Sequence, residues 1–303
     1  MKGKKVFLEK LRSDKSVAFM FLIPGIILFL VVSVYPLLYS LYISFVHWNP
    51  LDPNGLKTFA GLSNYINSLK NKDFLNAFLL ALKYTVFSLS IELVLGTGIA
   101  LLVTNERINR VILNIFRGFL LIPMTIAPIV TGILWKTIYN VNYGPLNFIL
   151  SFFHIPKIEW ISNPNNSFTA VIVVEVWQWT MVVAFILVGG ILALPKEPFE
   201  AATIDGASPI GSFFYITLPL LKPVYAVVIL LRTMDLFKAF DVIYVMTYGG
   251  PGRSTEVLNL FIYKQGMKFL DLTGASASSW ILLVILLPIS LYLLLKILVS
   301  PER

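Results

Sequence analysis

Cysteine is absent from this chain of 303 residues, and histidine occurs only as His47 and His154. Without cysteine the chain can form neither a disulfide bond nor a thiolate metal site. The two histidines stand alone near the ends of apolar segments, so they indicate no metal site. We find no combination of Ser, His and Asp, or of Cys and His, that indicates nucleophilic catalysis. The sequence therefore gives no reason to expect an enzyme.

Charged residues are also scarce, at 13% of the chain against roughly 25% in soluble proteins. Hydrophobic residues make up 57%, and several apolar runs exceed the about 18 residues that mark a transmembrane helix. We expect six spans, at residues 17–45, 79–104, 119–139, 168–194, 224–247 and 274–298. The third should bend at Pro123 and Pro128. The expected fold class is all-α integral membrane, with residues 17–303 as a single transmembrane domain in a lipid bilayer.

Basic residues decide the orientation that we expect. Six spans place both termini on one side, and residues 1–16 alone contain six lysines and arginines. The loops at 105–118 and 195–223 and the C-terminal tail bring this side more basic residues than the other side carries. The positive-inside rule therefore makes both termini cytoplasmic. The same rule explains the net charge of +8 without nucleic acid, because no basic stripe with interleaved aromatic residues is present.

The loop at 195–223 has a distinctive pattern of helix starts and stops. Pro198 suits the first turn of a helix, where its missing N–H costs little. Asp205-Gly206 should end that helix, since glycine tolerates the left-handed conformation of a helix stop. Ser208 and Pro209 are then predicted to be the N-cap and the first residue of a second helix. The loop is thus predicted to be two short helices with an elbow.

This loop resembles the EAA signature of permease subunits in binding-protein-dependent ABC importers. The matching residues are Glu200, Ala201, Ala202, Asp205, Gly206 and Ala207, followed by Phe213, Ile216, Leu218, Pro219 and Pro223. The resemblance implies a type I importer permease fold in which residues 200–207 form the coupling helix that docks into a cytoplasmic ATPase. It also implies a second permease subunit in a heterodimer, two ATPase subunits and an extracytoplasmic solute-binding protein. The complex would lie in the cytoplasmic membrane.

Two further sequence motifs indicate which subtype of importer permease the chain resembles. FAGLSNY at residues 59–65 is similar to a phrase that follows the first helix of sugar-importer permeases. Residues 241–277, with Thr247, Gly249, Gly250 and Pro251, resemble the first membrane subunit of maltose and glycerol-phosphate importers. The GGPGRST run lacks the lysine and the glycine spacing of a P-loop. We therefore expect no cofactor in this chain, with ATP and magnesium bound by the partner ATPase.

Charged residues inside the expected spans are costly and usually face a bundle interior or water. They are Glu92, Glu175, Arg232, Asp235, Lys238 and Asp241. Helical spacing places Arg232, Asp235 and Ala239 on one face of the fifth span, and it points Asp241 away if the helix is regular. One hypothesis is that this face lines a translocation path together with Glu175, Gln178 and Trp179. The alternative is internal salt bridging, such as Glu175 with Arg232, that only holds helices together.

The function that these observations favour is a permease subunit of an ATP-driven importer for a sugar or oligosaccharide. Glycerol-phosphate or another small polar solute is the main alternative, since Arg232 and Lys238 could attract a phosphate. An ion-coupled secondary transporter is a further alternative, although no internal repeat of the kind common in such folds is evident. A membrane-embedded enzyme would need convergent catalytic residues that the sequence does not offer.

Overall fold

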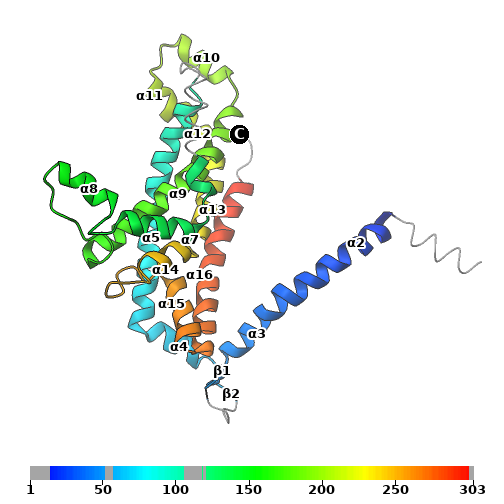
Figure 1. Ribbon diagram of the computed structural model, residues 1–303. Helices are drawn as coiled ribbons and strands as arrows, with labels where there is room; N and C mark the ends of the chain where they lie inside the picture. The colour runs from blue at the N-terminus through cyan, green and yellow to red at the C-terminus, as the bar shows by residue number, and fades with distance from the viewer. Residues whose placement is uncertain (1–13, 52–56, 106–117, 119–120, 300–303) are drawn as a thin grey trace, which may run out of the picture. The chain divides into compact units, whose positions relative to one another are not determined.

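The structure is a computed structural model that describes residues 14–51, 57–105, 118 and 121–299 (Figure 1). The described residues are mostly helical. The chain divides into two compact units, Met1–Ser68 with Gln265–Ile281 and Leu69–Lys264 with Leu282–Arg303. The expected basic segment 1–16 falls mostly outside the described residues, as does most of the 105–118 loop. The assignment of residues 17–303 to a single domain stays a prediction.

The first unit begins with a long apolar helix. It consists of α2 (Asp14–Phe29), the π-helical η1 (Leu30–Val34) and α3 (Tyr35–Ser44). The short strands β1 (Val46–His47) and β2 (Thr58–Phe59) pair antiparallel, and α4 (Ser63–Lys70) follows. The buried Asn64 amide donates to the carbonyls of Ser44 and Val46, each at 2.9 Å. The FAGLSNY motif therefore stabilises the turn that ends the first span, through the hydrogen bonds of Asn64.

The second unit is built on two long helices, α5 (Lys72–Val103) and α9 (Pro164–Leu192), which pack against each other. Small residues at helical spacing on α5 allow the close approach, among them Ala81, Ser88 and Gly96, all of which are buried. A Cβ atom at Gly96 would lie only 2.7 Å from Cγ1 of Val183. Glycine is therefore required for this helix contact.

The third expected span is broken. Residues 121–125 are helical, the helix is interrupted at 126–127, and α7 (Pro128–Ile138) starts again with Pro128 in its first turn. The side-chain amide of Gln178 donates to the carbonyl of Ile126 at 2.8 Å, which satisfies a backbone acceptor at the interruption. The short α8 (Pro145–Phe152) follows before α9.

The fifth span, expected at 224–247, is interrupted as well, so the regular helix that would point Asp241 away from Arg232 is not present. α13 (Lys222–Phe237) ends, three residues follow, and α14 (Asp241–Met246) begins. Asn259 donates to the carbonyl of Lys238 at 2.9 Å and satisfies an acceptor exposed by the interruption. Residues 209–220, which comprise α11 (Pro209–Ser212), η2 (Phe213–Thr217) and α12 (Leu218–Leu220), meet the following helix at 68°.

The last elements are α15 (Leu258–Tyr263), η3 (Lys264–Lys268) and α16 (Leu272–Val299). In the described part of the chain, four helices are long and apolar enough to cross a membrane, or five if the bent pair is one span. The four are Phe19–Ser44, Lys72–Val103, Pro164–Leu192 and Leu272–Leu295. A helical membrane protein is confirmed, and the count of six spans stays a prediction.

Candidate functional site

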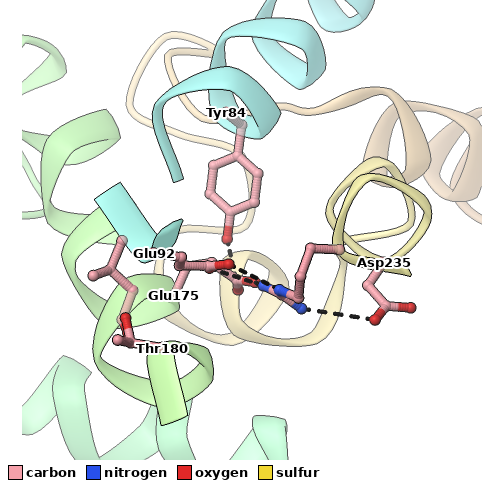
Figure 2. A network of polar contacts seen from close by, with 7 residues as sticks. Tyr84, Glu92, Glu175, Thr180 and Asp235 are labelled. Carbon is pink, nitrogen blue, oxygen red and sulfur yellow. Dashed lines mark hydrogen bonds and ion pairs between the residues drawn. The ribbon is translucent and has the colours of Figure 1, made fainter. Parts of the chain in front are cut away.

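A buried arginine joins the three principal helices of the second unit. Arg232, on α13, is 2% exposed. Its Nε and Nη2 donate to the two carboxylate oxygens of Glu92 on α5, each at 2.8 Å. Nη2 also donates to Oε1 of Glu175 on α9 at 2.7 Å. Figure 2 shows this network, which ties α5, α9 and α13 at one point.

The second carboxylate oxygen of Glu175 accepts a hydrogen bond from the buried hydroxyl of Tyr84 at 2.9 Å (Figure 2). Asp235 lies one turn along from Arg232, with 3.7 Å between Oδ2 and Nη1. Unlike the two glutamates it is largely exposed, at 59% of its side chain. The guanidinium also lies 5.2 Å from the ring centroid of Trp179, within the range of a cation–π contact. The two glutamates of the network are therefore shielded from solvent, whereas Asp235 is accessible to it.

The salt bridge that the sequence left as an alternative is thus present. Moving charges out of water is expensive, and such a pair is tolerated only with good geometry and further hydrogen bonds. Here Arg232 binds Glu92 in a bidentate manner, through two hydrogen bonds to its two carboxylate oxygens. Both carboxylate oxygens of Glu175 accept a hydrogen bond, one from Arg232 and one from Tyr84. Ion pairing does not exclude a transport role, because the accessible side of the network, at Asp235, borders a pocket.

This pocket has a volume of ≈ 240 Å³ and lies between α5, α9, α13, α14 and the start of α7. The break after Phe237 turns the chain, so that Asp241 faces the same pocket as Arg232 instead of pointing away. Five of the six residues predicted for the path line it, while Gln178 is fully buried and bonded to Ile126. Its lining is Tyr84, Pro128, Glu175, Trp179, Arg232, Asp235, Lys238, Ala239, Phe240, Asp241, Val242 and Ile243.

Sequence reasoning had not placed Tyr84, Pro128, Phe240 or Asp241 at this site. Tyr84 lies two helical turns before Glu92, and that spacing on one face of α5 was a usable signal. Phe240 and Asp241 reach the pocket only because the helix breaks at 238–240. No glycine or proline marks that break in the sequence, so periodicity alone could not have located it.

The loop at 195–223 forms the predicted pair of short helices. α10 (Glu197–Ile204) carries Pro198 in its first turn, and Asp205 is its C-cap. Gly206 adopts the left-handed conformation, with φ of +77°, and the amide of Ala207 bonds to the carbonyl of Ala202 at 2.9 Å. Ser208 caps the next helix by accepting from the amide of Gly211 at 3.1 Å. Both helix ends are those expected from the sequence.

Most of α10 faces away from the rest of the chain. Glu200, Ala201, Asp205, Gly206 and Ala207 are exposed, and Ala202 is half-buried. Ile204, at 86% exposure, is a large apolar side chain with little cover from its own chain. Phe199, Glu200 and Thr203 of α10 also border an open cavity of ≈ 570 Å³ against the ends of α5 and α9, so Glu200 is exposed and lies at the edge of this cavity.

Known proteins with the same features identify the family. The sequence profile described as "Binding-protein-dependent transport system inner membrane component" matches residues 92–300. The chain belongs to this family. It is 34% identical over 250 residues to the trehalose/maltose transport system permease protein MalF of Thermococcus litoralis, covering 82% of this chain and 83% of that protein. It is 30% identical over 281 residues to the arabinooligosaccharides transport system permease protein AraP of Bacillus subtilis, covering 92% of this chain and 88% of that protein.

A solved structure supports the fold. A chain from the crystal structure of a bacterial ABC transporter involved in the import of the acidic polysaccharide alginate matches with a TM-score of 0.82. The match covers 98% of this chain and 99% of that chain at 19% identity, which bears on the fold alone. The protein is thus a multi-pass permease component of an inner-membrane transport system, with the fold of an ABC importer permease. Its family consists of transport permeases, which are not catalytic subunits.

Proposed function

We propose that this permease is one membrane subunit of an ATP-driven importer of a sugar or oligosaccharide, and that the Arg232 pocket is part of its translocation path. The main support for this proposal is that aromatic and charged side chains line this pocket together. A half-buried tryptophan, Trp179, stands beside the exposed carboxylate of Asp235 and the ammonium of Lys238. Relatives whose names refer to trehalose, maltose and arabinooligosaccharides support the choice of substrate class.

The chemistry of the pocket suits a neutral sugar. The indole of Trp179 offers a flat apolar face, and Asp235 and Asp241 can accept hydrogen bonds from hydroxyl groups. Arg232 is already engaged by Glu92 and Glu175, so its charge is largely offset before any ligand arrives. The lining has three carboxylates and two cations, a balance that disfavours a phosphate ester and makes the glycerol-phosphate alternative weaker.

The energy for transport would come from other chains. The segment from Glu200 to Ala207, which comprises most of α10 and the turn after it, is proposed to dock into a cytoplasmic ATPase that binds ATP and magnesium. Closure of two such ATPases would move α10. α10 shares the cavity behind it with the ends of α5 and α9, the helices that carry Glu92 and Glu175, and this supports transmission of the movement to the pocket. ATP binding would then shift the permease between states that differ in their affinity for the sugar.

The remaining partners and the orientation are proposed on the same basis. A second permease would complete a heterodimer, and an extracytoplasmic binding protein would deliver the sugar, in keeping with the family description. Both termini and α10 would be cytoplasmic, because basic residues concentrate on that side. An ion-coupled transporter would leave the exposed α10 without a partner.

Co-expression with the neighbouring genes, followed by mild-detergent purification, tests the class. We expect a second permease and an ATPase to co-elute. The reconstituted complex should take up a labelled sugar with ATP, and Trp179→Ala and Asp235→Ala should each reduce uptake while assembly stays normal. Unchanged uptake and sugar-stimulated ATP hydrolysis in both variants would contradict the pathway. Transport by the chain alone would contradict the importer itself.

A further inference from the structure

Four aromatic residues next to the pocket form a continuous cluster, which we call the aromatic platform. It consists of Phe240, Tyr244, Tyr248 and Tyr263. Phe240 stacks on Tyr244 at a centroid distance of 5.1 Å, and Tyr263 meets both rings edge-on, at 4.9 and 5.6 Å. Tyr248 extends the cluster, with its ring 5.1 Å from that of Tyr244.

The platform is only partly covered by protein. Phe240, Tyr244 and Tyr263 are half-buried, and Tyr248 is 38% exposed. Aromatic rings that serve only as a core are normally more fully covered, because their apolar area stabilises the fold when it is removed from water. Three of the four rings also carry a hydroxyl group. Flat apolar faces with adjacent hydroxyl groups are the surface that a carbohydrate ring with polar edges would contact.

The backbone at Tyr248 is held in an unusual conformation. Its φ of 52° lies in the left-handed region, which is rare for a bulky residue and costs free energy that the surroundings must supply. The hydroxyl groups of Thr247 and Thr255 lie 2.7 Å apart and close the turn that follows. Beneath the ring, the ammonium of Lys264 is 4.6 Å from the ring centroid and is paired with the buried Glu256. The turn and the buried ion pair thus fix one exposed ring.

The platform leads into the pocket. Phe240 belongs to both, since it lines the pocket and stacks on Tyr244. Asn259, at the start of α15, bonds to the carbonyl of Lys238 and holds the segment that joins them. Tyr248 lies on the side of the chain that the basic-residue distribution makes extracytoplasmic.

We propose that the aromatic platform is a carbohydrate-binding subsite that receives a sugar ring on Tyr248 and Tyr244 before the sugar enters the Arg232 pocket. The proposal rests on the proposed function as a sugar importer. It assigns the rings a positioning role at the mouth of the path. A sugar released from the binding protein would be retained by stacking, so that ATP-driven opening would carry it inward.

The test uses the complete complex and its binding protein in proteoliposomes, with labelled maltose, trehalose and arabinotriose as probes. The readout is the amount of sugar taken up for each ATP hydrolysed. Tyr248→Leu removes the aromatic face, and Tyr248→Phe retains it. Tyr143→Leu is the matched control, because Tyr143 lies in a predicted outer loop and is 72% exposed. Tyr263→Leu carries the same prediction if Tyr248→Leu does not assemble.

We expect Tyr248→Leu to lower the sugar-to-ATP ratio about three- to ten-fold, the range that corresponds to the loss of one aromatic contact. Tyr248→Phe should stay within about two-fold of the unsubstituted complex, and Tyr143→Leu should match it. Equal ratios for Tyr248→Leu and Tyr143→Leu would overturn the platform and leave the sugar importer standing. Failure of the unsubstituted complex to move any of the three sugars would overturn the sugar importer, and the platform with it.

Discussion

Replacing Arg232 by methionine should destabilise the permease strongly. The substitution keeps an unbranched side chain of similar length but removes the donors that Glu92 and Glu175 share. Both glutamates are buried, with side-chain exposures of 0% and 7%, so their charges would remain in a low-dielectric interior without a partner. Breaking a buried ion pair in this way typically costs ~3–5 kcal/mol.

Asp235→Asn provides the control within the same network. Asp235 also contacts Arg232, but at 3.7 Å and with 59% of its side chain exposed. Solvent screening reduces the contribution of such a contact to at most about 1 kcal/mol. The structure thus predicts that two substitutions in one network differ several-fold in their effect on stability.

Thermal unfolding of the purified complex, followed by loss of the monodisperse peak in size-exclusion chromatography, measures the difference. Arg232→Met should lower the midpoint by roughly 6–20 °C, and Asp235→Asn by no more than about 4 °C. The triple variant Arg232→Met, Glu92→Gln, Glu175→Gln should recover at least half of the loss, because no unpaired charge remains buried. A midpoint for Arg232→Met equal to that for Asp235→Asn would refute the argument.

Further predictions concern glycines and the coupling helix. Gly96→Ala should cost about 1–3 kcal/mol, since its Cβ would lie 2.7 Å from Val183, whereas Gly98→Ala, with nothing within 4 Å, should be neutral in the same thermal assay. Gly206→Val places a β-branched residue at a φ of +77° and should lower ATP-driven sugar uptake while the complex still inserts, with Gly98→Ala again as the control. Glu200→Ala should weaken the stimulation of ATP hydrolysis by sugar without reducing assembly. Normal stimulation in that variant would contradict a coupling role for Glu200.

Much of the fold follows from local rules that the sequence displays openly. The helix ends at Pro198, Gly206 and Ser208 are where their backbone preferences place them, because glycine, proline and a capping serine act over only a few residues. The salt bridge between Glu175 and Arg232 was also foreseeable, since buried charges in a membrane protein require partners.

The breaks in the spans were harder to predict. Pro128 indicates a bend in the third span, but the helix is in fact interrupted just before it. The carbonyl of Ile126, at the interruption, accepts a hydrogen bond from the side chain of Gln178 on another helix. The break at 238–240 has no local marker. It is accommodated by Asn259, which lies 21 residues further along the chain from Lys238. Such tertiary hydrogen bonds cannot be read from periodicity, and they decide which residues line the pocket.

Cysteine labelling shows whether a sugar passes the Arg232 pocket. The chain has no cysteine, so Ala239→Cys introduces a single thiol into the pocket lining and leaves every charged and aromatic side chain of the pocket in place. Gln178→Cys is the matched control, because Gln178 is fully buried on α9 outside the pocket lining. A membrane-impermeant maleimide should label the thiol at 239, but not that at 178, and transported sugar with ATP should slow the labelling at 239. Labelling at 239 that stays the same with and without sugar and ATP would contradict a path through this pocket.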